Sequence, residues 1–142
     1  MIGIRHIGLI VDDLDKSLEL YNDVLGFTPK IDQVEKGTFY EHITGIKFGV
    51  ARTCKCYSSN GTCIELIQYQ SKSLIKREKT LVCEGFNHIA LDVDEIDKVY
   101  KKLKSIGITF INPPKYNDDK TAIVAFCKDF EGNHLELVQT NF

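Results

Sequence analysis

Residues 6–16 read HIGLIVDDLDK, and residues 88–98 read HIALDVDEIDK. Seven of these eleven positions are identical between the two stretches. Each stretch opens with a histidine, continues as a short apolar run and closes on acids followed by a lysine, which is typical of a strand that leads into a helix. A repeat of this kind within 142 residues indicates an internal duplication.

The residues after each copy predict an amphipathic helix. Apolar residues recur there at helical spacing, and a glycine follows where the helix should end. Asp12 or Asp13 can cap the first of these helices. The apolar positions are Leu14, Leu18, Tyr21 and Leu25 ahead of Gly26, and Ile96, Val99, Tyr100, Leu103 and Ile106 ahead of Gly107.

The two halves also end alike. TCIELIQYQ at 62–70 and NHLELVQTN at 133–141 share the order apolar, Glu, Leu, apolar, Gln, and each follows a turn signal, SSNG or DFEG. We expect two more strands in each half. They are predicted near 38–42 and 47–57 in the first half, and near 108–111 and 121–127 in the second, with the turn PPKYNDD between the last two.

Each half therefore reads β-α-β-β-β, which predicts an α+β fold of two similar modules. The first module is expected at 1–70 and the second at 84–142. A polar, basic stretch that begins SKSLIKREKT joins them, so the linker is expected at 71–83. A pseudo-two-fold axis should relate the modules.

Strand geometry predicts which side chains share a face, because alternate residues point to opposite sides. The apolar set Ile7, Leu9 and Val11 should pack on the helix, so His6 lies on the open face with the small Gly8. In the second module, His88 lies on the open face with Ala90. Small residues beside each histidine leave room for a ligand.

The last strand of each module places a carboxylate on the same open face. Leucines and isoleucines flank Glu65 and Glu136 and should take the helix side. A carboxylate among apolar residues is costly to desolvate unless it is paired or binds a metal. The alternative, that His6, Glu65, His88 and Glu136 are solvated residues repeated by descent alone, stays open. His42 and His134 have no counterpart in the other repeat; His134 could line the cleft but is not assigned as a ligand.

Composition narrows the class of protein. The net charge is −2 and basic residues form no block, so we expect no nucleic-acid partner. The apolar runs fall far short of the roughly 18 residues that a membrane span requires, and the N-terminal residues do not resemble a signal peptide. Five cysteines at irregular spacing argue against a disulfide framework, and Cys54 and Cys56 are expected to be buried thiols. We therefore expect a cytoplasmic protein.

The chain resembles the vicinal oxygen chelate superfamily, which includes glyoxalases, bleomycin and fosfomycin resistance proteins and extradiol dioxygenases. The matching stretches are RHIGLIVDDLDKSLELYNDVLGF, TCIELIQY, FNHIALDVDEIDKVYKKLKSIGI and DFEGNHLELVQ. The resemblance implies paired βαβββ modules that form a cup-shaped, mostly antiparallel sheet around one divalent metal ion. It maps the metal ligands onto His6, Glu65, His88 and Glu136.

Two imidazoles and two carboxylates suit Ni²⁺, Co²⁺, Zn²⁺, Mn²⁺ or Fe²⁺. Such an ion makes the proton next to a bound carbonyl acidic, so that Glu136 or Glu65 can remove it. The His/Glu/His/Glu set is similar to that of glyoxalase I (lactoylglutathione lyase), which isomerises a hemithioacetal. The resemblance thus implies a metal-dependent lyase with a small-molecule substrate, either a hemithioacetal or a thioester.

Other members of the superfamily remain alternatives. A methylmalonyl-CoA epimerase-like racemase commonly has Gln at the position of Glu65, and an extradiol dioxygenase uses one carboxylate fewer. A resistance protein that only binds its ligand generally lacks the metal ligands. Neither Arg5 nor Arg52 is a clear clamp for glutathione, although Arg52 could reach the cleft. We expect a homodimer, in which the site lies within one chain or is shared between two.

Overall fold

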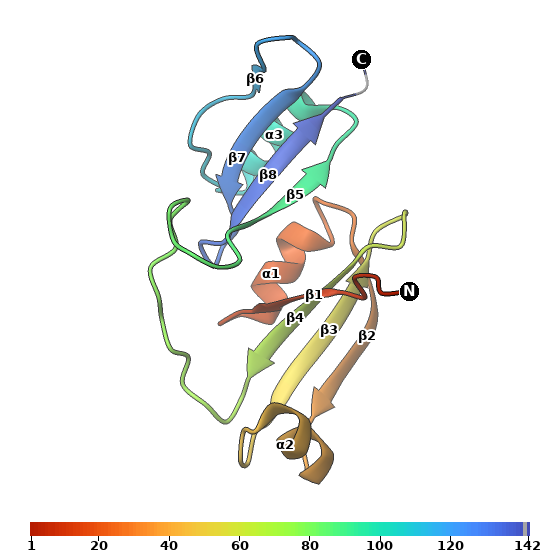
Figure 1. The fold of residues 1–142 in the computed structure, drawn as a ribbon, viewed down its shortest axis with the longest axis vertical. Coiled ribbons are helices and arrows are strands. Elements are labelled where there is room, and N and C mark those ends of the chain that lie inside the picture. Colours follow the sequence, from red (N-terminus) through yellow and green to blue (C-terminus); the bar gives the residue numbers. More distant parts are fainter. Residues whose placement is uncertain (141) are drawn as a thin grey trace. The chain divides into compact units, whose positions relative to one another are not determined.

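The computed structural model describes residues 1–140 and 142, and Asn141, at the end of the predicted second module, lies outside the described residues. The chain divides into two compact units, Met1–Lys76 and Arg77–Phe142, at a point inside the stretch expected to be the linker. Each unit holds one four-stranded mixed sheet, and the described part of the chain contains three helices in all. The predicted α+β fold of two βαβββ modules is confirmed (Figure 1).

The first unit has the strand order β1-β4-β3-β2. Strand β1 runs parallel to β4, and the other neighbours are antiparallel. The apolar face of this sheet packs on α1, where Val11, Leu14, Leu20, Ile64 and Leu66 are fully buried. The elements are β1 (Ile7–Ile10), α1 (Leu14–Tyr21), β2 (Thr28–Glu35), α2 (Thr38–Thr44), β3 (Ala51–Tyr57) and β4 (Cys63–Tyr69).

The second unit repeats the plan with the order β5-β8-β7-β6. Strand β5 is parallel to β8, and α3 covers the apolar face, where Ile96, Leu103, Leu135 and Leu137 are buried (Figure 1). The elements are β5 (His88–Asp92), α3 (Ile96–Ser105), β6 (Lys115–Tyr116), β7 (Ile123–Lys128) and β8 (His134–Gln139).

The predicted helix signals hold in both units. Of the two candidate caps, Asp13 is the one whose side chain accepts a hydrogen bond from the Lys16 amide at the start of α1. Gly26 and Gly107 follow the two helices with φ of 77° and 90°, a conformation that other residues rarely adopt. The glycines therefore let the chain leave each helix and turn back to the sheet.

The strand predicted near 38–42 is wrong, because Thr38–Thr44 forms α2. Gly37 and Gly45 bound this segment, and both have positive φ. The Thr44 hydroxyl donates back to the Tyr40 carbonyl, and Glu41 accepts from the Phe48 amide. These local hydrogen bonds stabilise the short helix. Its sequence contains Thr, Phe, Tyr and Ile, which favour strands, and this explains the wrong prediction.

The remaining strand of the first sheet is β2, at residues 28–35, which no sequence pattern predicted. It lies at the sheet edge, contains Pro29 and has mostly exposed side chains, so it lacks alternation. In the second unit the predicted strand 108–111 is reduced to a bridge between Phe110 and Cys127. Two prolines follow, and β6 then forms inside the stretch predicted as a turn.

Helices α1 and α3 each begin on a glutamine from the last strand of their own sheet. Gln68 Oε1 accepts from the Leu14 amide at 2.8 Å, and Gln139 Oε1 accepts from the Ile96 amide at 2.9 Å. The first amides of a helix have no partner within the helix. The Gln of the repeated Glu-Leu-apolar-Gln pattern therefore joins sheet to helix in both units.

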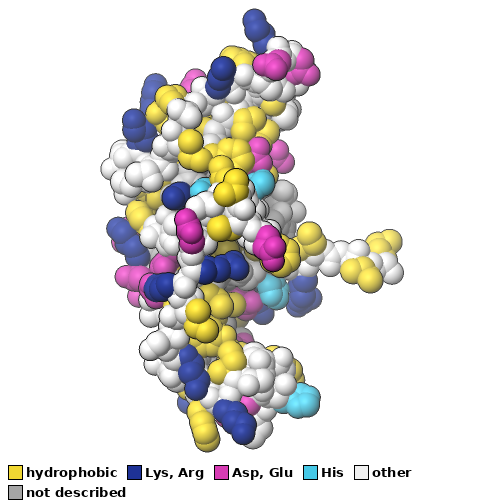
Figure 2. Space-filling view, turned by 60° about the vertical axis from the view of Figure 1, so that its left-hand side comes forward, with side chains coloured by type: hydrophobic (Ala, Val, Ile, Leu, Met, Phe, Trp, Pro, Cys, Tyr) yellow, Lys and Arg dark blue, Asp and Glu magenta, His cyan; other side chains and the backbone are white. Residues whose placement is uncertain are grey.

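Charged side chains of both signs lie on the surface of the protein. Figure 2 shows basic and acidic side chains interspersed over the face in view, with scattered hydrophobic side chains between them. None of the described helices combines the length and the hydropathy that crossing a bilayer requires.

Candidate functional site

The first unit brings His6 and Glu65 together on the open face of its sheet. Gly8 is the register partner of Glu65 in the parallel pair of β1 and β4, so the histidine two residues earlier shares that face. His6 Nε2 lies 3.0 Å from Glu65 Oε2. Lys55, opposite Glu65 on β3, places its Nζ 3.6 Å from the other carboxylate oxygen.

The second unit repeats the pair at equivalent positions. Ala90 is the register partner of Glu136, and His88 Nε2 lies 3.3 Å from Glu136 Oε2. Phe126 occupies the register position that Lys55 holds in the first unit. Its ring meets the His88 ring edge-on, with the centroids 5.3 Å apart. The two pairs thus share geometry but differ in their third neighbour.

The hydrogen bonds of Asn87 decide how His88 presents its ring. Asn87 Nδ2 donates to the Thr80 carbonyl at 3.0 Å, so Asn87 Oδ1 is an acceptor toward His88 Nδ1, also at 3.0 Å. His88 Nδ1 therefore carries a proton, and Nε2 is the nitrogen that faces Glu136. In the neutral ring, Nε2 offers a lone pair.

A lone pair and a carboxylate oxygen at this distance repel unless a cation lies between them. That cation is either a proton on the ring or a metal ion that both atoms bind. The side chains of Glu65 and Glu136 are 12% and 23% exposed, so water shields these contacts only in part. The donor set of imidazole nitrogen and carboxylate oxygen fits a divalent ion of the Ni²⁺ to Zn²⁺ series.

Each pair supplies two donors of the predicted set of four. In the part of the chain that the structure describes, no group of three or more His, Cys, Asp or Glu side chains could hold a metal ion. The pairing of His6 with Glu65 and of His88 with Glu136 is a feature of the structure. Their assembly into one centre stays a prediction.

Three neighbours of these pairs were not predicted from the sequence: Lys55, Phe126 and Asn87. The first two lie opposite the glutamates across a hairpin, so their positions depend on the register through a turn. Asn87 could have been found from the sequence, because it directly precedes His88 and its side-chain oxygen can accept a hydrogen bond from a ring nitrogen.

Arg52 does not reach the open face. Its guanidinium donates to Asp32 at 2.9 and 2.7 Å and to Asp15 at 2.8 Å, which ties β2 to α1 on the helix side of the sheet. The hydrogen bond from Arg52 lowers the pKa of the Asp32 carboxyl. Cys54 and Cys56 are free, buried thiols, as expected, and burial raises the pKa of both.

Each unit has a cavity on its surface, and His6 lines that of the first unit. Arg5, His6, Asn60 and Thr62 help to line the first, of about 340 Å³. The second, of about 360 Å³, is lined by the segment ahead of β5 and by His134. Burial lowers the pKa of His134, and the charges of Lys128 and His88 act in the same direction.

Comparison with known proteins identifies the family. The profile of the Glyoxalase/Bleomycin resistance protein/Dioxygenase superfamily matches residues 3–137. The chain is 30% identical over 136 residues to a probable lactoylglutathione lyase of Synechocystis, an alignment that covers 96% of this chain and 94% of the relative.

Solved structures share the fold. A glyoxalase family protein from Bacillus cereus superposes with a TM-score of 0.91 at 15% identity, over 100% of this chain and 96% of the other. The fosfomycin resistance protein FosX from Mesorhizobium loti superposes with a TM-score of 0.62 at 18% identity, over 96% and 91%. The repeated βαβββ units and the match along nearly the whole sequence lead to one conclusion: the chain belongs to the Glyoxalase/Bleomycin resistance protein/Dioxygenase superfamily.

Proposed function

We propose that this protein is a metal-dependent lyase of the glyoxalase I type, which isomerises a hemithioacetal by moving a proton next to its carbonyl group. The observation that carries the proposal is the pair of His and Glu side chains at equivalent positions of both units, with Nε2 and Oε2 3.0 and 3.3 Å apart. The relative from Synechocystis, named probable lactoylglutathione lyase, supports the same reaction class.

In this proposal His6, Glu65, His88 and Glu136 hold one divalent ion, drawn from a single chain or from two chains of a homodimer. A bound divalent ion polarises a carbonyl oxygen and makes the adjacent C–H proton acidic. The protein residues then have to hold the ligand atoms in place and carry the proton from one carbon to its neighbour.

Glu136 is the better placed base of the two carboxylates. Glu65 is fixed from two sides, by His6 at 3.0 Å and by Lys55 at 3.6 Å, as expected of a residue that only binds the ion. Beside Glu136, an aromatic ring stands in place of the ammonium group. Glu136 is therefore free to turn toward the substrate carbon and return.

The test combines metal analysis with an assay on the hemithioacetal of methylglyoxal and glutathione. We expect close to one divalent ion per complete set of four ligands, and activity that a chelator removes and added Ni²⁺ or Zn²⁺ restores. Glu136→Gln should lower kcat by roughly 10²-fold or more while the ion stays bound, because general base catalysis typically contributes 10²–10⁴-fold.

Glu19→Gln is the matched control, since Glu19 is an exposed carboxylate on α1 that pairs with Lys16. It should leave kcat unchanged. The proposal is wrong if the purified protein binds no divalent metal, or if Glu136→Gln turns over as fast as Glu19→Gln. Turnover of an acyl-CoA or a catechol in place of the hemithioacetal would instead support the racemase or the dioxygenase.

The origin of the ligands can be tested by complementation. His6→Ala and His88→Ala each remove a ligand from a different unit. If the site is shared between two chains of a homodimer, mixing the two inactive variants restores part of the activity. If each chain holds all four ligands, the mixture stays inactive.

A further inference from the structure

We propose that the cavity lined by His6 binds a carboxylate group of the substrate, and that Arg5 and Lys55 select for this group. The substrate is then a hemithioacetal whose thiol part is anionic. The identity of the substrate rests on the proposed function, whereas binding of a carboxylate in this cavity does not. All the residues concerned belong to the first unit.

The cavity is lined by an arginine and by no acidic residue. Its volume is about 340 Å³, and its lining comes from residues 4–7 at the start of β1 and residues 60–63 at the start of β4. Arg5 is exposed, and its guanidinium forms no hydrogen bond or ion pair with any described residue. An unpaired cation in a cavity without carboxylates favours a negatively charged ligand.

Asn60 adds a hydrogen-bond donor to the same cavity. Its Oδ1 accepts from the Ser58 hydroxyl and, at 3.0 Å, from the Thr62 amide. The side-chain oxygen is therefore the acceptor in both contacts, and Nδ2 has no acceptor among the described residues. Guanidinium and amide N–H groups are donors to which a carboxylate binds well.

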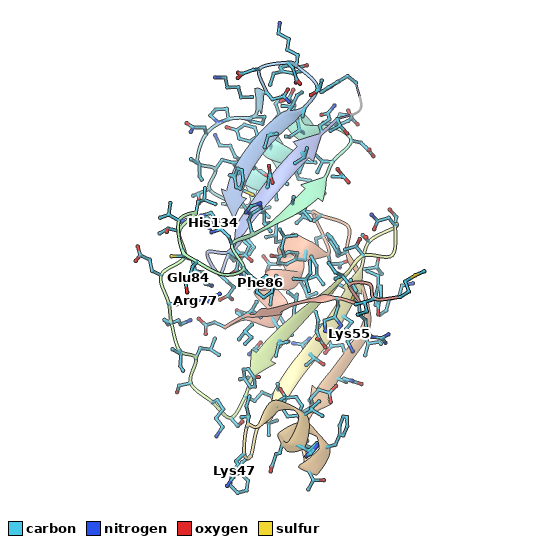
Figure 3. The ribbon with its side chains drawn as sticks, in the orientation of Figure 1. Lys47, Lys55, Arg77, Glu84, Phe86 and His134 are labelled. Carbon is cyan, nitrogen blue, oxygen red and sulfur yellow. The ribbon has the colours of Figure 1, made fainter. Side chains whose placement is uncertain are left out.

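Lys55 places a second cation on the open face next to this cavity. Cys63 lines the cavity, and Glu65 follows it on the same face of β4. Tyr57 and Lys55 are their register partners on β3. Two residues along a strand span roughly 7 Å, so Lys55 lies one such step from the lining of the cavity. Figure 3 shows Lys55 on the sheet of the first unit.

The ammonium group of Lys55 keeps hydrogen-bond donors for a ligand. Its Nζ lies 3.6 Å from Glu65 Oε1, beyond the roughly 2.7–2.9 Å of a charge-assisted hydrogen bond. It forms no hydrogen bond with any described residue, although its side chain is only 23% exposed. Because an ammonium group has three donors, Lys55 can bind a carboxylate while it stays beside Glu65.

The charges in this part of the open face act on Tyr57. A hydrogen bond with the Cys63 thiol raises the pKa of the Tyr57 hydroxyl, the charge of Arg5 lowers it, and the charge of Glu65 raises it. The field of Arg5 therefore reaches the face on which Tyr57 lies. The two cations and the cavity form one anion-binding region next to the candidate ligands His6 and Glu65.

The position of this region indicates which part of the substrate is anionic. In the proposed function, the reacting carbon lies near His6 and Glu65. A carboxylate in the cavity is then a few bonds from that carbon, and the thiol part of a hemithioacetal is the part that can carry it. A small thiol with a carboxylate, such as 3-mercaptopropionate, has roughly this spacing.

The first experiment measures binding without turnover. The probes are 3-(methylthio)propionate and its neutral amide, which differ by one charge and cannot react. In NMR titrations of the whole protein, we expect the carboxylate to bind roughly 10-fold more tightly, as is typical for hydrogen bonds to a charged group. Arg5→Gln and Lys55→Gln should each remove most of this preference.

Lys47→Gln is the matched control and should keep the preference, because Lys47 is an exposed lysine of the same unit, beyond α2 (Figure 3). Equal binding of the carboxylate and the amide by the unmodified protein overturns the proposal. A full preference in Arg5→Gln or in Lys55→Gln overturns it as well.

The second experiment compares the hemithioacetals that methylglyoxal forms with 3-mercaptopropionate and with 3-mercaptopropionamide. We expect a higher kcat/KM for the anionic substrate, and Arg5→Gln should raise its KM while kcat changes little. Equal values of kcat/KM overturn the proposed selectivity, although the proposed function stands. If neither hemithioacetal turns over, the proposed function fails, whereas the binding result stands.

Discussion

Asn87 is the residue on which the chemistry of His88 depends. Its amide is oriented by the Thr80 carbonyl, so its oxygen fixes the proton on His88 Nδ1 and directs Nε2 toward Glu136. Partners of this type determine which tautomer a metal-binding histidine adopts and hold its ring in place. A single amide at the start of β5 thus decides which nitrogen is available to an ion.

Replacing Asn87 tests this role. Asn87→Leu removes the acceptor, and we expect the affinity for Co²⁺ to fall by roughly 10–100-fold, as is typical when a hydrogen-bond partner of a metal ligand is lost. Isothermal titration calorimetry measures the change. Asn87→Asp keeps an acceptor for His88 Nδ1 but loses the donor to the Thr80 carbonyl, so it should bind more tightly than Asn87→Leu and less tightly than the unmodified protein.

Asn112→Leu is the control, because Asn112 is exposed in the second unit. It should leave Co²⁺ binding unchanged. Equal affinities for Asn87→Leu and Asn112→Leu would show that Asn87 has no part in positioning His88.

At the scale of single residues, the sequence predicts which side chains share a face but not what surrounds them. Strand alternation and duplication are enough to place His6 with Glu65 and His88 with Glu136. The position of Lys55 depends on how β3 and β4 are aligned across the turn at 58–62. One residue more or less in that turn would move Lys55 to the other face.

At the scale of elements, the glutamine at the end of each last strand sets the start of a helix. Gln68 reaches the first amide of α1 and Gln139 the first amide of α3. These contacts join segments that are 54 and 43 residues apart in sequence. One strand in each unit therefore has two roles: its Glu lies on the open face of the sheet, and its Gln binds the first amide of a helix.

Removing one glutamine should weaken its unit. Gln68→Ala leaves the Leu14 amide unpaired, and we expect the free energy of unfolding to fall by about 1 kcal/mol, the usual contribution of a capping hydrogen bond. Urea denaturation measures this. Gln70→Ala, at an exposed position two residues further on, should change stability by less than about 0.5 kcal/mol. A Gln68→Ala variant as stable as Gln70→Ala would contradict this role.

The errors in the predicted elements have a common physical cause. Both β2 and β6 are edge strands, which need only one hydrogen-bonded neighbour and whose side chains are largely exposed. Burial therefore imposes no alternation on their sequences. Gly37 and Gly45, both with positive φ, bound α2. The residues between them have a composition typical of a strand, which led to the wrong prediction. Central strands and long helices, which bury a face, were predicted correctly.

At the scale of the whole molecule, each unit has its own apolar core. Leu66 and Leu137 occupy equivalent central-strand positions, and both side chains are completely buried. In both units the same pattern of apolar residues packs a mixed sheet against a helix. Both leucines lie on strands that the sequence predicted, β4 and β8, and not on the edge strands β2 and β6.

The repeat predicts that the two leucines contribute alike. Leu66→Ala and Leu137→Ala should each lower the free energy of unfolding by about 2–5 kcal/mol, the range for removing a buried leucine side chain. Urea denaturation of both variants, with exposed Leu81→Ala as the control, measures the difference. If one of the two buried leucines proves as dispensable as Leu81, the units do not have equivalent cores.

Lys55 and Phe126 have an evolutionary consequence. An ancestor built from two copies of one module would have carried every substitution twice, so a lysine beside one glutamate required a lysine beside the other. Two copies within one chain can change independently, so that constraint does not apply to them. The present chain keeps the histidines, the glutamates and the helix-starting glutamines in both halves, yet has charge beside one carboxylate and an aromatic ring beside the other. The two repeated carboxylates of one chain therefore have different electrostatic surroundings.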